Sequence, residues 1–102
     1  MTKISVLIKE PGKKPRHVNI SNTLANLQKT VDGYIETVTF SKEIVVICNE
    51  EGRIRGLPYN CEIFGIDFVG TIIICGTEGE EFSDLRGNIK IWKEAFPSLW
   101  DE

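Results

Sequence analysis

Cationic, aromatic and amide side chains that could hold a nucleotide occur in three separate segments of this chain. The first is a basic turn around Pro11-Gly12, the second begins at Gly33, and the third covers residues 53–60. Lysine and arginine bind phosphate, aromatic rings stack on bases, and polar side chains read base edges. The residues predicted to bind a ligand are Lys13, Arg16, Tyr34, Glu36, Arg53, Arg55, Tyr59 and Asn60.

Each segment also has a simpler interpretation. The Pro11-Gly12 turn is typical of a solvated hairpin, Tyr34 of a half-buried packing residue, and Asn60 of a side chain that caps its own turn. The ligand hypothesis therefore requires a fold that brings the three segments together.

Little in the chain suggests catalysis or metal binding. Cys48, Cys61 and Cys75 lack the paired spacing of zinc ligands, and His17 is the one histidine. Glu50 and Glu51 are neighbours in an expected turn, where carboxylates stay hydrated and point apart. We predict a protein that is not an enzyme, with no cofactor, no metal and reduced thiols in its core.

Length and charge narrow the class of protein further. The 102 residues suit a single domain, residues 1–102, and the net charge is −3. Residues 1–42 carry +4 and residues 43–102 carry −7, and the basic region is too small for a nucleic-acid interface. We expect no membrane span and no signal peptide, and therefore a cytoplasmic protein.

Two apolar runs predict the strands around which the fold is built. Residues 44–48 and 72–75 are largely β-branched, as in neighbouring strands buried on both faces. Residues 4–20 predict a hairpin, and Ser21, Asn22 or Thr23 can cap a short helix that ends at Asp32-Gly33, with Gly33 left-handed.

The second half of the chain is expected to complete the sheet and to end in a helix. Residues 49–52 predict a turn with Gly52 at positive φ, residues 53–55 a return strand, and residues 56–60 a loop. Residues 63–68 are ambiguous. A last helix capped by Ser83 or Asp84 would carry an apolar stripe of Leu85, Ile89, Trp92 and Phe96. The expected fold is α+β, a mostly antiparallel sheet of five or six strands with one helix after the second strand and one at the C-terminus.

The apolar tail beyond Pro97 has two interpretations. Leu99 and Trp100 either fold back onto their own sheet or pack on a second subunit and support a homo-oligomer.

Several short motifs together resemble one family. They are Glu10-Pro11-Gly12-Lys13-Lys14-Pro15, Asn22-Thr23-Leu24, Leu27-Gln28, Gly33-Tyr34-Ile35-Glu36, Ile47-Cys48-Asn49-Glu50-Glu51-Gly52, Leu57-Pro58-Tyr59-Asn60 and Gly70-Thr71. In this order they resemble an uncharacterised family of small domains from phages, plasmids and conjugative elements of Gram-positive bacteria. The resemblance covers about residues 4–85.

The resemblance implies a genomic setting and no particular activity. Many small proteins of mobile elements act against host defence. The predicted function is a non-enzymatic counter-defence protein that sequesters a small nucleotide-derived immune signal, in the host cytoplasm if phage-encoded. The alternative is an inhibitor or adaptor that binds a host protein and no small molecule.

Overall fold

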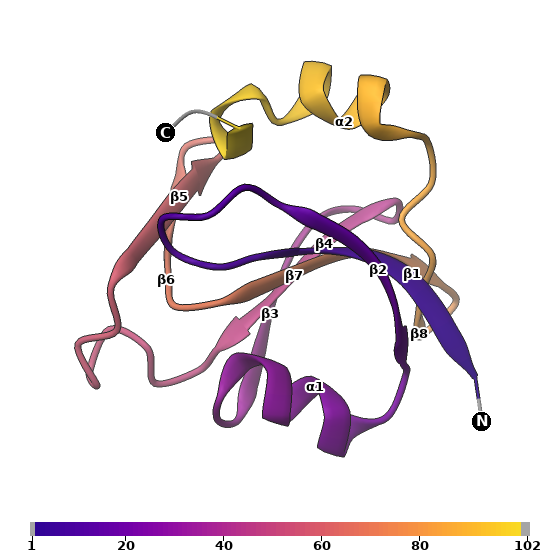
Figure 1. Cartoon of the computed structure of the whole chain (residues 1–102). Coiled ribbons are helices and arrows are strands. Elements are labelled where there is room, and N and C mark those ends of the chain that lie inside the picture. Colours follow the sequence, from indigo (N-terminus) through magenta and orange to yellow (C-terminus); the bar gives the residue numbers. More distant parts are fainter. Residues whose placement is uncertain (1, 101–102) are drawn as a thin grey trace.

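The computed structural model describes residues 2–100, which form two sheets and three short helical segments (Figure 1). The strands are β1 (Lys3–Lys9), β2 (Arg16–Ser21), β3 (Ile35–Ser41), β4 (Ile44–Asn49), β5 (Tyr59–Ile63), β6 (Ile66–Val69), β7 (Ile72–Glu78) and β8 (Glu81–Ser83). The helices are α1 (Leu24–Val31) and α2 (Ile89–Ala95), and the 3₁₀ turn η1 (Pro97–Trp100) follows α2.

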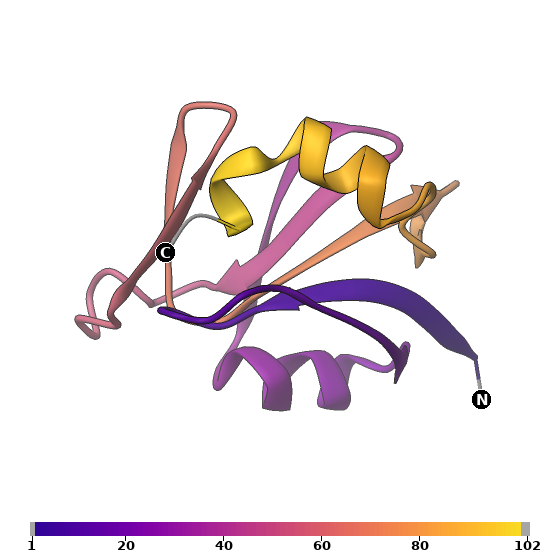
Figure 2. The ribbon, with the colours of Figure 1, turned by 45° about the horizontal axis from the view of Figure 1, so that its top comes forward.

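Six strands form an antiparallel main sheet, in the order β2-β1-β7-β4-β3 with β8 paired to β7. Strands β5 and β6 form a separate hairpin. Helix α1 covers one face of the main sheet, while α2, η1 and the β5–β6 hairpin lie on the other (Figures 1 and 2). The predicted α+β class, sheet type and helix positions are confirmed.

The two apolar runs form neighbouring strands, as predicted. Val45 and Ile47 of β4 are opposite Cys75 and Ile73 of β7. Because side chains alternate across a strand, Ile73 joins the core under α1 and Ile74 joins the core under α2. The sheet thus separates two apolar cores.

The first hairpin and helix also form as predicted, with one correction. Thr23 caps α1, since its hydroxyl accepts a hydrogen bond from Asn26 N at 3.2 Å. The left-handed residue that ends α1 is Asp32, with φ 63°, and not Gly33. Aspartate tolerates this conformation better than most side chains do, so the Asp-Gly pair was misassigned by one position.

Residues 53–55 do not form the predicted return strand. Residues 50–56 are a series of tight turns, in which Arg55 N donates to Glu51 O at 2.8 Å and Gly56 N to Arg53 O at 3.1 Å. Gly52 is also not at positive φ. A Cβ there would lie 2.9 Å from Val69 Cγ2, so glycine is required by close packing against β6.

Residues 56–58 are a turn and loop as expected, whereas Tyr59, Asn60 and the ambiguous residues 63–68 belong to the β5–β6 hairpin. Strand β5 already begins at Tyr59, and Phe64 and Gly65 form a two-residue turn with φ of 48° and 84°. Two positive φ values are typical of a type I′ turn, whose twist matches that of the strands. The Phe64 ring lies 5.1 Å from Phe40 and 5.6 Å from Phe96, so aromatic contacts hold an unusual residue at this position.

The C-terminal helix is shorter than predicted. Its cap is Asn88, whose Oδ1 accepts a hydrogen bond from Ile91 N at 3.1 Å, and neither Ser83 nor Asp84 has this role. Leu85 precedes the helix and Ile89 is exposed, whereas Trp92 and Phe96 are buried.

The tail beyond Pro97 packs on its own chain. Leu99 is 1% exposed and Trp100 lies against the same core cluster. Leu99 therefore follows the first of the two interpretations of the sequence and packs on its own sheet, while Trp100 is partly buried beside it. No helix within residues 2–100 is long and apolar enough to cross a membrane.

Candidate functional site

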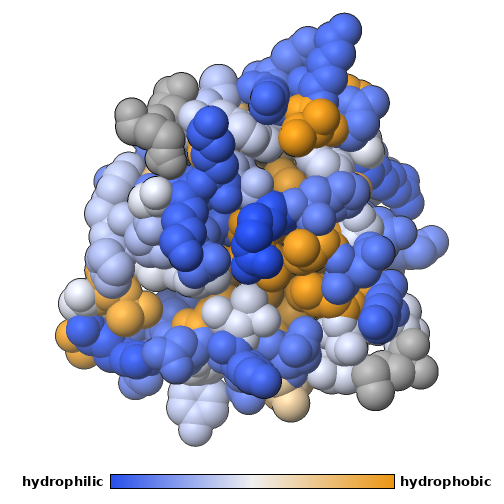
Figure 3. Space-filling model, viewed as in Figure 1, coloured by the Kyte–Doolittle hydropathy of each residue, from blue (hydrophilic) through white to orange (hydrophobic). Residues whose placement is uncertain are grey.

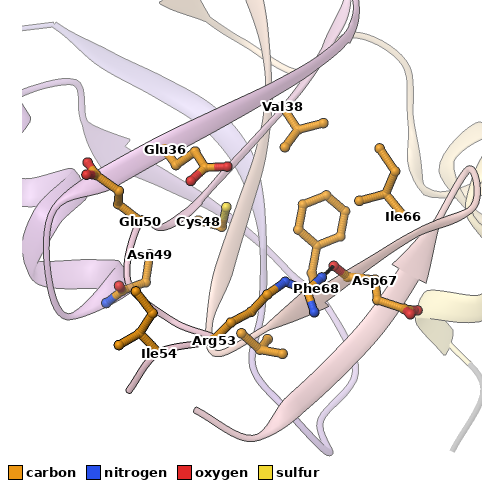
Figure 4. A pocket seen from close by; sticks show the side chains of 11 residues that line it. Glu36, Val38, Cys48, Asn49, Glu50, Arg53, Ile54, Ile66, Asp67 and Phe68 are labelled. Atoms are coloured by element: carbon orange, nitrogen blue, oxygen red, sulfur yellow. Dashed lines mark hydrogen bonds between the residues drawn. The ribbon is translucent and has the colours of Figure 1, made fainter. Parts of the chain in front are cut away.

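A cleft of about 320 Å³ opens between the β3–β4 end of the main sheet and strand β6 (Figure 4). The turns of residues 50–56 form one rim. Its lining residues are Glu36, Val38, Cys48, Asn49, Glu50, Arg53, Ile54, Ile66, Asp67, Phe68 and Val69.

Strand alternation determines which side chains reach the cleft. The side chains of Val38 and Cys48 lie on the α2 side of the sheet. Glu36 is two residues before Val38 on β3, so its side chain lies on the same side. Phe68, buried to 3% exposure, faces them from β6 (Figure 4). These side chains form an apolar floor with a carboxylate at its edge.

Asn49 holds the turns of residues 50–56 at the rim. Its Nδ2 donates to Val31 O and to Asp32 O, both at 3.0 Å, and its Oδ1 accepts from Glu51 N at 2.7 Å. The side chain is buried and connects the end of α1 to the start of the turns. The sequence predicts a turn that begins at Asn49, a typical turn initiator after an apolar strand, but it does not indicate the bonds from this side chain to the end of α1.

Arg53 joins the turns to β6. Its Nη2 donates to the backbone oxygen of Asp67 at 2.7 Å, the contact drawn dashed in Figure 4. The Asp67 carboxylate in turn accepts a hydrogen bond from Tyr59 Oη at 3.2 Å. One cation and one tyrosine are therefore connected through Asp67.

The cleft carries more negative than positive groups. Glu36 and Glu50 line it together with the single cation Arg53, whereas the carboxylate of Asp67 is turned toward Tyr59 (Figure 4). Burial, followed by the nearby Glu36, raises the pKa of the Cys48 thiol to about 11, although Arg53 acts in the opposite direction. The thiol is therefore neutral at physiological pH and a poor nucleophile.

The fold brings together only part of the predicted site. Glu36 and Arg53 line the cleft, and Tyr59 adjoins it through Asp67. Tyr34 is 66% exposed outside it. Arg55 bonds to Asp32, with Nη1 2.6 Å from the backbone oxygen and Nη2 3.2 Å from Oδ2.

Asn60 and the basic turn lie elsewhere. Asn60 is buried and donates to Lys9 O and Gly70 O, both at 2.7 Å, so its amide joins β5 to the end of β1 and to the connection before β7. Lys13 and Arg16 pair with Glu10 at 3.8 and 3.5 Å. Arg16 contributes with Lys29 to a different cleft, on the α1 side of the sheet.

A serine and the histidine are also hydrogen-bonded to each other, Ser5 Oγ with His17 Nε2. Asp84 Oδ1 accepts a hydrogen bond from Ser5 N at 2.8 Å, so the carboxylate does not complete a Ser-His-Asp arrangement through that bond. The His17 ring packs edge-on against Trp92 at 4.8 Å, which fits a structural pair that joins β1, β2 and α2. Within residues 2–100, no group of three His, Cys, Asp or Glu side chains could hold a metal ion.

The fold and the cleft define a small α+β protein with a mixed polar and apolar cleft beside β6. The chain belongs to the family described as Domain of unknown function (DUF3846), whose family model matches residues 2–97. The match includes α2, which the resemblance noted in the sequence left out. No curated protein and no solved structure matches the chain.

Proposed function

We propose that this protein is a non-enzymatic binding protein that sequesters a small nucleotide-derived signal in the cleft between β3–β4 and β6. The observation that carries the proposal concerns Arg53. Three of the four predicted cations, Lys13, Arg16 and Arg55, form ion pairs, whereas Arg53 forms none within residues 2–100 and lies in the cleft.

The chemistry of the cleft suits the parts of a nucleotide. The apolar floor around Phe68, Val38 and Cys48 can pack against a base. Carboxylates such as Glu36 accept hydrogen bonds from ribose hydroxyls or amino groups. Arg53 uses one N–H on Asp67 and keeps others for a phosphate oxygen.

Charge and size limit the ligand. Glu36 and Glu50 outnumber the one guanidinium at the cleft and oppose a ligand with many phosphates, so the signal should carry one or two. A volume of about 320 Å³ is at the lower end of ligand pockets, which measure roughly 300–1,000 Å³. The cleft thus suits one nucleoside unit of the ligand.

The biological role follows from the resemblance to domains of mobile elements. A protein that binds an immune signal without cleaving it would lower the concentration of that signal in the host cytoplasm. We propose this counter-defence role, with the ligand released intact on denaturation.

Calorimetry against a panel of cyclic nucleotides and cyclic ADP-ribose isomers tests the proposal. At least one compound should bind, and Arg53→Ala should weaken binding about tenfold or more, since it removes a charge-assisted hydrogen bond. Arg55→Ala is the matched control, because Arg55 lies two positions away and pairs with Asp32 outside the cleft. No binding across the panel, or equal losses for both variants, would contradict the proposal.

One observation favours a second candidate function, an inhibitor or adaptor that binds a host protein. Ile54 is 89% exposed at the cleft rim and Ile66 is 40% exposed across from it. Exposed apolar side chains around an acidic cleft suit a basic, apolar segment of a protein. A host protein that co-purifies with the wild type, and is lost on Ile54→Asp, would favour this candidate.

A further inference from the structure

The two edges of the main sheet differ in how they are protected. In an antiparallel pair, alternate residues direct their N–H and C=O groups toward the neighbouring strand. Glu50 N donates to Tyr34 O at 2.8 Å, so residues 34, 36 and 38 are bonded toward β4. The backbone groups of Ile35, Thr37 and Thr39 therefore point out of the free edge of β3.

The edge at β2 is protected. The bond of 2.9 Å from Asn22 N to Thr2 O places the backbone groups of His17, Asn19 and Ser21 on the outside. Ser21 O accepts a hydrogen bond from Asn26 Nδ2 at 3.1 Å. Lys13, Lys14, Pro15 and Arg16 stand at the other end of this edge, and lysine and proline are residues that discourage strand pairing.

The edge at β3 has less protection. A register shift lies between Thr39 and Ser41 and Lys42 follows in the turn, so the regular free edge covers residues 35–39. Residues 35–41 contain no lysine, arginine or proline, and the three outward residues Ile35, Thr37 and Thr39 are all β-branched. Thr37 and Thr39 are exposed, and β3 is the last strand of the sheet order. Such an edge is a template for one more strand.

We infer that two copies of this chain pair through their β3 edges, antiparallel and about a twofold axis at Val38. In this register Thr37 of one copy is opposite Thr39 of the other, and their outward N–H and C=O groups bond. Threonine pairs across strands are favourable. Glu36 then faces Phe40 of the second copy.

Electrostatics favours this register over its neighbour. If the twofold axis passed through Thr37, the Glu36 side chains of the two copies would be diagonal neighbours across the strands and would repel each other. With the axis at Val38, the two Glu36 side chains lie two residues further apart along the strands. Because Glu36 and Val38 line the cleft, the β3 of the second copy extends the cleft floor on its open side. The inference does not rest on the proposed ligand.

Sedimentation velocity across micromolar concentrations tests the inference. The wild type should approach twice the 11.5 kDa of one chain. In the double variant Thr37→Lys, Thr39→Lys, the lysine at position 37 of each copy would face the lysine at position 39 of the other. The repulsion between these like charges should raise the dimer dissociation constant about tenfold or more. Asn19→Lys, on an exposed outward residue of the β2 edge, is the matched control and should leave the dimer unchanged.

Amide hydrogen exchange of the wild type is a second, independent measurement of pairing at the β3 edge, and it requires no variant. The amides of Thr37 and Thr39 should exchange more slowly as protein concentration rises, and those of His17 and Asn19 should not change. A wild type that remains monomeric at high micromolar concentration overturns the inference. So does a dimer that survives the double lysine variant, or one that Asn19→Lys abolishes.

Discussion

The two faces of the main sheet are covered in different ways. The single helix α1 covers one face, with Leu27 and Val31 buried against Val45, Ile47 and Ile73. Three separate pieces, α2, η1 and the β5–β6 hairpin, cover the other (Figure 2).

The cleft lies on the face that is covered in pieces. Strand β6 packs beside β3 and β4 without hydrogen bonding to them as a sheet neighbour, and the space between them remains open. When several separate elements cover one face of a sheet, gaps remain between them. In this protein such a gap holds polar side chains above an apolar floor. The outer surface is mainly hydrophilic with scattered apolar patches, as Figure 3 shows for one side.

The largest expected effect tests whether both faces are equally essential. Val46 faces the α2 side and Ile73 the α1 side, and both are fully buried. Val46→Asp or Ile73→Asp would bury an unpaired carboxylate at a cost of several kcal/mol, comparable with the stability of a small domain. Circular dichroism should show that both variants are unfolded, and a soluble, cooperatively folding product of either would contradict the assignment of these strands.

A smaller effect compares the covers themselves. Leu27 in α1 and Leu99 in η1 are equally buried, at 2% and 1% exposure. Leu27→Ala and Leu99→Ala should each lower the free energy of unfolding by about 2–5 kcal/mol, measured by urea denaturation. If Leu99→Ala caused no loss while Leu27→Ala did, η1 would not be part of the second core.

Asn49 connects the two faces, because its side chain bonds the end of α1 to the turns at the cleft rim. Asn49→Ala leaves the carbonyls of Val31 and Asp32 without this donor and should cost about 1–3 kcal/mol. Urea denaturation measures the loss. Asn19→Ala, an exposed position on β2, is the control and should change stability by less than about 0.5 kcal/mol.

The smallest effect concerns the thiols. Burial raises the pKa of Cys75, under α1, from 9.0 to about 12, and that of Cys48, in the cleft, to about 11. Because the unfolded chain loses these protons first, stability should fall as the pH rises above 9. The loss between pH 8 and 10 should be about 1 kcal/mol for the fully buried Cys75 and smaller for the half-buried Cys48. Cys48→Ala should reduce this loss in pH-dependent denaturation, and an unchanged pH profile would contradict the burial of that thiol.

Features with local causes could be predicted from the sequence. The β-branched runs of β4 and β7, the Pro11-Gly12 hairpin and a helix cap within residues 21–23 depend on neighbouring residues. All three form, with the cap at Thr23. The sequence does not decide where the apolar tail packs, since only the fold shows that a core is available for Leu99.

The errors have physical causes as well. Arg53-Ile54-Arg55 alternates like a strand, but the Asn49 side chain starts a series of turns that period-two patterning does not detect. The positive φ of Asp32 and Phe64 depends on the end of α1 and on packing against Phe40 and Phe96. The acidic character of the cleft required β6 to be placed beside β3, which no local signal indicates.

Mass spectrometry of the small molecules released by heat tests the ligand proposal most directly. The protein is purified from cells in which nucleotide-based immune signalling has been activated, as wild type and as Val38→Trp, which fills the cleft with a large side chain. The wild type should release an intact nucleotide-derived compound, and a folded Val38→Trp variant should release little or none. A wild type that releases no such compound, or a filled cleft that releases as much as the wild type, would contradict the claim that this cleft binds a nucleotide signal.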